Sequence, residues 1–134
     1  MSPRKGLTAA DIMTERVVTG GPHDGLWRIA NEMQRHNIGS VVIAEKEKIL
    51  GILTERDFVR IVEQVGVLLE KNLAMHHMSK PVLTVQSDAP LADVVKLMRD
   101  KHVRHLLVLS KAGDVAGIIS SRDLMKVAAD TILV

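Results

Sequence analysis

The chain has 134 residues, of which 46% are hydrophobic and 25% charged, and its formal net charge is +2. This length allows one domain with a real core, and no apolar run approaches the roughly 18 residues of a membrane-spanning helix. The small charge and the presence of only two aromatic residues, Trp27 and Phe58, argue against nucleic acid as a partner. With no cysteine, disulfides and thiol catalysis are excluded. Residues 1–6 lack the apolar segment of a secretory signal, so we expect a cytoplasmic protein.

An internal repeat organises the chain. Met13 and Leu26 recur 65 residues later as Met78 and Leu91, whereas the match of Gly51 with Gly117 is at 66 residues. The extra residue is predicted in a polar turn, Glu45–Lys48 in one copy and Lys111–Asp114 in the other, because turns tolerate insertions. Self-similarity of this kind predicts two copies of one structural unit.

Hydrophobic periodicity gives the elements of the first copy in chain order. A short helical lead-in (Ala9–Met13) precedes a short strand (Val17–Thr19) and a helix from Asp24, its expected N-cap, to about His36. Buried strands then form a hairpin, and a second helix follows Thr54. The strands of the hairpin are centred on Val41–Ile43 and Gly51–Leu53, and the residues expected to face inward are Leu26, Ile29, Ala30 and Met33 in the first helix and Phe58, Ile61, Val62 and Val65 in the second.

The second copy repeats this order. Its lead-in is Leu73–Met78, its first strand Val82–Val85, and its first helix begins at Pro90 and runs to about Lys101. The hairpin pairs Leu106–Leu109 with a strand ending at Ser120, before the last helix. Inward positions are Leu91, Val94, Val95 and Met98, then Leu124, Val127 and Ala128. The predicted fold is α/β (α+β): two β-α-β-β-α repeats, residues 8–66 and 73–130, packed about a pseudo-twofold axis.

The end of each hairpin carries the sequence's most informative motif. It is Gly51-Ile-Leu-Thr-Glu-Arg-Asp57 in the first copy and Gly117-Ile-Ile-Ser-Ser-Arg-Asp123 in the second. One interpretation is a capping box, in which the hydroxyl and the aspartate satisfy N–H groups of the first helical turn. The other is a nucleotide site, with the helix N-terminus for phosphate and the carboxylate for ribose hydroxyls. The residues themselves leave both open.

Taken in their order along the chain, these features resemble a tandem pair of CBS domains, the regulatory modules named after cystathionine β-synthase. The resemblance rests on the two Gly-to-Asp endings and on four shorter stretches, and it runs from about Thr8 to Ala129; the one mild departure is Leu107, where the family usually has Pro. The four stretches are Asp11–Thr14, His77–Ser79, Ile38–Ile43 and Val103–Val108. A stand-alone CBS pair is expected to be a regulatory module without a catalytic domain, so we expect no enzyme activity.

The resemblance implies binding of an adenine nucleotide (AMP, ADP or ATP) in clefts between the repeats. S-adenosylmethionine and NAD are alternative ligands, and no catalytic cofactor is expected. We expect the Asp123 cleft to be tighter, because Arg104 adds a charge-assisted phosphate contact where the first copy has Gly39. The residues assigned to the tighter cleft are Val17, Thr19, Ser40, Arg104, Ser120, Arg122 and Asp123; those assigned to the second cleft are Gly39, Thr54, Arg56, Asp57, Val82, Thr84 and His105.

Other features carry weaker expectations. The pairs His76-His77 and His102-x-x-His105 lack an evident third ligand, so we expect no metal site. No Walker-type loop or Ser-His-Asp arrangement favours catalysis. The family resemblance predicts a homodimer, with Trp27 either anchoring it or lying at a core edge, and a regulated protein as a further partner. The competing function is a structural or interaction module with empty clefts.

Overall fold

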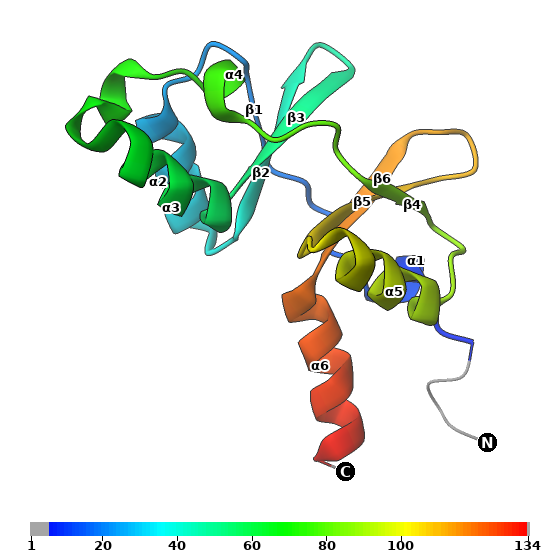
Figure 1. Ribbon diagram of the computed structural model, residues 1–134. Helices are drawn as coiled ribbons and strands as arrows, with labels where there is room; N and C mark the ends of the chain where they lie inside the picture. The colour runs from blue at the N-terminus through cyan, green and yellow to red at the C-terminus, as the bar shows by residue number, and fades with distance from the viewer. Residues whose placement is uncertain (1–5, 134) are drawn as a thin grey trace. The chain divides into compact units, whose positions relative to one another are not determined.

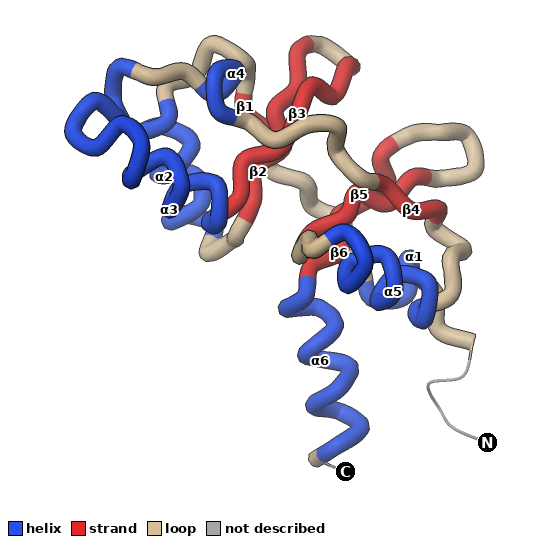
Figure 2. Tube along the Cα trace, in the orientation of Figure 1, coloured by secondary structure: helices blue, strands red, loops and turns tan. Residues whose placement is uncertain are grey.

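The computed structural model describes residues 6–133 and divides the chain into two compact units (Figure 1). One unit is residues 17–82, and the other joins residues 1–16 to residues 83–134. Each unit contains a three-stranded sheet and its own helices (Figure 2). No helix within residues 6–133 has the length and apolar character needed to cross a bilayer.

The unit of residues 17–82 begins with the predicted β-α-β-β-α order. The sheet has the strand order β1-β2-β3; β1 is parallel to β2, and β2 and β3 form an antiparallel hairpin. A parallel pair needs a crossover, and α2 supplies it. The elements are β1 (Thr19–Gly20), α2 (Leu26–His36), β2 (Ser40–Glu45), β3 (Lys48–Thr54), α3 (Glu55–Val65), the 3₁₀ helix η1 (Gly66–Lys71) and α4 (Ala74–His77).

The other unit has the same topology. Its strand order is β4-β5-β6, with β4 parallel to β5 and β5 antiparallel to β6. The elements are α1 (Ala9–Ile12), β4 (Thr84–Gln86), α5 (Leu91–Lys101), β5 (His105–Leu109), β6 (Val115–Ser120) and α6 (Ser121–Ile132). The predicted fold class is therefore confirmed in both copies.

The lead-in helices are exchanged between the copies. Although α4 precedes the second repeat in sequence, it belongs to the unit of residues 17–82, where Ser79 forms an antiparallel bridge with Ile52 of β3. Likewise α1 precedes the first repeat but belongs with β6, through a bridge between Thr14 and Ile118. Each lead-in therefore packs on the hairpin of the other repeat.

Glycine permits this close crossing. A Cβ atom at Gly117 would lie 2.7 Å from the Thr14 carbonyl oxygen, and one at Gly51 would lie 2.9 Å from the Ser79 carbonyl oxygen. Such separations are shorter than real Cβ contacts, and the obstructing atoms are backbone. The two glycines of the repeated motif thus allow the lead-in to lie directly against the strand.

The extra residue of the second copy lies in the hairpin turn, as predicted. Ala44 pairs with Ile49 in the first hairpin, and the matching pair in the second is Leu109 with Val115, which encloses one more residue. The longer turn contains Gly113 at φ 90°, a backbone conformation that suits glycine.

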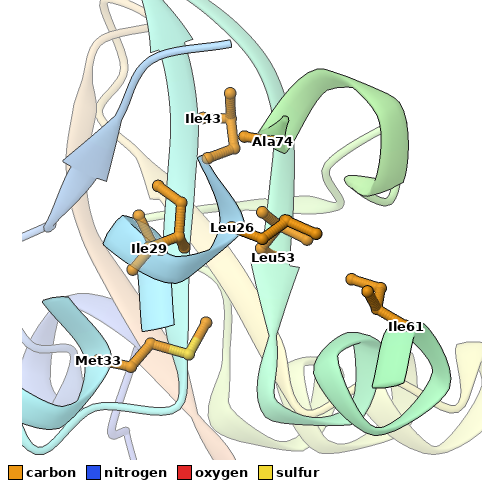
Figure 3. Close-up of a cluster of buried hydrophobic side chains, with 8 residues drawn as sticks. Leu26, Ile29, Met33, Ile43, Leu53, Ile61 and Ala74 are labelled. Atoms are coloured by element: carbon orange, nitrogen blue, oxygen red, sulfur yellow. The ribbon is translucent and has the colours of Figure 1, made fainter. Parts of the chain in front are cut away.

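Each unit has its own hydrophobic core. In the unit of residues 17–82 (Figure 3), side chains from α2, the hairpin, α3 and α4 converge. This core contains Leu26, Ile29, Met33, Val41, Ile43, Leu53, Ile61 and Ala74. The other contains Ala9, Val94, Met98, Leu106, Val108 and Ile119. Met33 and Met98 pack in these cores, as ordinary apolar side chains do.

Several local predictions were wrong. The short strands begin two residues later than expected, at Thr19 and Thr84. The N-cap of α2 is Gly25, because the Asp24 carboxylate instead accepts the Gly21 N–H at 2.8 Å. Pro90 is likewise the N-cap of α5, one residue before the helix.

Two valines assigned to inward faces are exposed. Val62 is 53% exposed and Val95 is 47% exposed, because Ile61 and Val94 take the buried position beside each of them. The helices therefore bury narrower stripes than the sequence pattern indicated.

Candidate functional site

The junction between β3 and α3 is built by a complete capping box. The Thr54 hydroxyl accepts the Asp57 N–H at 3.2 Å, and Asp57 Oδ2 accepts the Thr54 N–H at 2.9 Å. The Thr54 hydroxyl also lies 3.1 Å from Asp57 Oδ2. These bonds satisfy groups that the start of a helix otherwise leaves without partners.

The junction between β6 and α6 repeats this geometry. The Ser120 hydroxyl accepts the Asp123 N–H at 3.4 Å, and Asp123 Oδ2 accepts the Ser120 N–H at 2.9 Å. Asp57 and Asp123 are each only 8% exposed. The capping interpretation is therefore correct at both junctions, and each box fixes a buried carboxylate.

The other oxygen of each carboxylate contacts a hydroxyl of the lead-in. Ser79 donates to Asp57 Oδ1 at 2.8 Å, and Thr14 donates to Asp123 Oδ1 at 3.2 Å. The Ser79 contact lies within the unit of residues 17–82, and the Thr14 contact lies within the other unit. The junctions thus hold the lead-ins as well as starting the helices.

Sequence reasoning missed Thr14 and Ser79 as site residues. The signal for them was present, because both are hydroxyl residues that directly follow the matched pair Met13 and Met78. Their partners lie 109 and 22 residues away in sequence, so no local pattern could assign the contact.

The first-turn N–H groups are less available than a phosphate site on the helix N-terminus requires. The Ser121 N–H donates to the Arg104 carbonyl at 2.9 Å, and the Glu55 N–H donates to the Gly39 carbonyl at 3.0 Å. The N–H of each aspartate is held by its cap. Phosphate contacts at these junctions would therefore come mainly from side chains.

The basic residues near the junctions differ in their surroundings. Arg104 is exposed, and its backbone carbonyl fixes its position beside the first turn of α6. Arg56 and Arg122 are also exposed, and neither is without an interaction partner. Burial lowers the pKa of His77, with further lowering by Arg60 and His76, and its Nε2 lies 2.8 Å from Asn72 Oδ1.

The residues assigned to each cleft fall into both units. Within residues 17–82, Ser40 is buried and pairs with Thr54, close to Asp57. In the other unit, His105 pairs with Ser120, close to Asp123. Val17, Thr19 and Val82 belong to the first unit, and Thr84 belongs to the second. The pairing of residues across the units stays a prediction.

The described residues contain no group of three His, Asp or Glu side chains placed to hold a metal ion. What the two junctions do offer is a buried carboxylate, a hydroxyl and nearby cations. This set can accept hydrogen bonds from a ligand diol and attract an anionic group.

Comparison with known proteins identifies the family. A family model for the CBS domain matches residues 9–64 and again residues 71–130. An uncharacterized protein of Methanopyrus kandleri is 37% identical over 124 residues, which are 92% of this chain and 63% of that protein. The chain thus spans somewhat less than two thirds of that relative.

Solved structures share the fold. A CBS-domain containing protein from Agrobacterium tumefaciens is 30% identical, with a TM-score of 0.84, and the match covers 90% of this chain and 92% of that one. The CBS domain pair of the protein MJ0100, solved with 5′-methylthioadenosine and S-adenosyl-L-methionine, has a TM-score of 0.83 at 22% identity, covering 93% and 98%. The chain therefore belongs to the CBS-domain family and carries two copies of the domain.

Proposed function

We propose that this chain is a non-catalytic regulatory module that binds an adenine nucleotide at the junction around Asp123. The observation that carries the proposal is the buried Asp123 carboxylate. It accepts three hydrogen bonds from described residues, whereas a carboxylate has about four acceptor positions. One position is left for a hydroxyl of a ribose.

Phosphate is favoured over a cationic sulfonium by the charges beside this junction. Arg104 lies next to the first turn of α6, where the other copy has Gly39. A guanidinium attracts phosphate and repels a sulfonium group. We therefore favour AMP, ADP or ATP over S-adenosylmethionine, although the ligands of the MJ0100 domain pair support an adenosine-containing ligand in general.

Regulation requires that ligand binding change how another surface of the protein interacts with a partner. We propose a homodimer in the cytoplasm that passes the nucleotide signal to a target protein. Exposed apolar side chains on α2, α3 and α6 support this assembly; they are Trp27, Val59 and Met125. The competing function, an interaction module without a ligand, makes the same use of those helices.

Calorimetric titration with AMP, ADP, ATP and adenosine tests the proposal. Asp123→Ala should weaken AMP by about 10- to 100-fold, because hydrogen bonds to a charged group contribute about 1.5–3 kcal/mol. Arg104→Ala should weaken the binding of AMP but leave the affinity for adenosine unchanged. A nucleotide at 100 times its Kd should add about 2.7 kcal/mol to the free energy of unfolding.

The exposed Asp88→Ala variant is the control, because it removes a carboxylate far in sequence from either motif. These ligands and S-adenosylmethionine are also tested at millimolar concentration. If none of them produces heat or a shift in Tm, the result favours the interaction module instead.

A further inference from the structure

The two junctions differ in the residue that lies three positions after the aspartate. This residue is Arg60 in the first copy and Lys126 at the matching place in the second. Arg60 Nη2 lies 3.4 Å from Asp57 Oδ1 and donates to the His77 carbonyl at 3.0 Å. The guanidinium therefore connects α3 to the end of α4. Lys126 is exposed, and its ammonium group has no hydrogen bond or salt bridge with another described residue.

The carboxylates consequently differ in the acceptor positions they retain. Asp57 Oδ2 accepts the N–H and hydroxyl of Thr54, and Asp57 Oδ1 accepts Ser79 and Arg60. These four donors match the number of positions a carboxylate offers. Asp123 has three donors among the described residues, and none of them is a cation.

A ligand hydroxyl at Asp57 would have to displace a donor already in place. Displacing Ser79 would free the lead-in hydroxyl, whose contact is the shorter of the two lead-in bonds, 2.8 Å against 3.2 Å for Thr14. Displacing Arg60 would also disturb its bond to the His77 carbonyl. A ligand hydroxyl at Asp123 would displace no cationic donor of the described residues, and it would break no bond like the one between Arg60 and the His77 carbonyl.

We propose that Arg60 is a positioning residue that commits Asp57 to holding α4, and thereby leaves Asp123 as the carboxylate that receives the ligand. This inference rests on the adenosine ligand proposed above. It assigns the inequality of the two sites to a residue outside the repeated motif, acting through Asp57.

Titration of the full chain with adenosine tests this inference. Adenosine carries no phosphate, so the loss of a cation cannot act through phosphate attraction. In Arg60→Met, binding at the Asp57 junction should strengthen at least tenfold, and Asp57→Asn in the same chain should abolish that gain. The matched variant Lys126→Met should leave both sites within about twofold. Lys126→Arg should weaken adenosine binding at the Asp123 site, because it would place a guanidinium beside Asp123 as Arg60 places one beside Asp57.

Hydrogen exchange gives a second readout that needs no ligand. Arg60→Met should speed exchange at least tenfold at the Ile52 and Ser79 amides, which bond to each other's carbonyls. Lys126→Met should leave the matching Thr14 and Ile118 amides unchanged. Unchanged exchange in Arg60→Met, or a second site that stays equally weak, would overturn the inference. Failure of the unmodified chain to bind any adenosine compound would overturn the proposed function instead, and exchange would still decide the role of Arg60.

Discussion

Gly117 shows how one residue sets the distance between a lead-in and its strand. It lies in β6, and the backbone of Thr14 packs directly against it. Gly21 is a useful contrast, since a Cβ there would make only an ordinary contact, 3.7 Å from Asp24 Oδ2. Similar glycines therefore have different tolerances for a side chain.

We predict that Gly117→Ala lowers the free energy of unfolding by about 1–3 kcal/mol, the usual cost of overpacking. The added methyl group must push Thr14 away and weaken its bridge to Ile118. Urea denaturation measures the effect, with Gly21→Ala as the control that stays within about 0.5 kcal/mol of the unmodified chain. Equal stability of Gly117→Ala and the unmodified chain would show that the lead-in is not held against β6.

The buried aspartates should also differ in their contribution to stability. Asp57→Ala leaves Thr54, Ser79 and Arg60 without a shared partner, so we expect a loss of about 2–3 kcal/mol. Asp123→Ala removes fewer contacts and no cation, and should cost about 1–2 kcal/mol. Chemical denaturation without ligand compares the two variants. A greater loss in Asp123→Ala would contradict the roles assigned here.

At the scale of elements, the short helix α4 is stabilised by its surroundings rather than by its own length. A four-residue helix has almost no intrinsic stability. It is held by buried Ala74, by the Ala74 N–H bond to the Asp24 carbonyl, and by the Arg60 bond to His77. His77 lies at the end of this helix and contacts Asn72.

The lowered pKa of His77 predicts a dependence of stability on pH. Burial disfavours the charged imidazole in the folded chain, with Arg60 and His76 adding repulsion. Below about pH 6.5 the unfolded chain therefore takes up this proton more readily than the folded chain does. Stability should fall as pH drops below 6.5, and His77→Gln should reduce that fall. Denaturation midpoints of the unmodified chain and of His77→Gln at pH 7.5, 6.5 and 5.5 test this. The same dependence of the midpoint on pH in both would contradict it.

At the scale of the whole molecule, the helices leave apolar side chains exposed. Val59 on α3 and Met125 on α6 occupy matching positions in the two copies, and both are largely exposed. Apolar side chains at equivalent outer positions are a natural basis for association through helices.

We predict a homodimer that Val59→Glu and Met125→Glu together convert to a monomer, because the interface would bury unpaired carboxylates. Light scattering at micromolar concentration measures the mass, and Val115→Glu, on a strand, is the control that should remain dimeric. A mass near 14.7 kDa for the unmodified chain would contradict the prediction.

The sequence by itself determined the repeat and the order of elements in each copy, and it offered the capping box as one of two interpretations of each repeated motif. These features depend on local spacing: periodicity within one helix or strand, and a hydroxyl three residues before an aspartate. The narrower buried stripes, with Val62 and Val95 exposed, were beyond it, because neighbouring residues competed for the same core positions.

Only the tertiary structure decided which lead-in packs on which hairpin. The Thr14 contact with Asp123 joins residues 109 apart, and the Arg60 contact with His77 joins residues 17 apart. Such contacts arise when a folded unit brings distant segments together, and no periodicity within either segment encodes them. The exchange of lead-ins and the different hydrogen-bond partners of Asp57 and Asp123 follow from packing between segments, which is why they appear only in the folded chain.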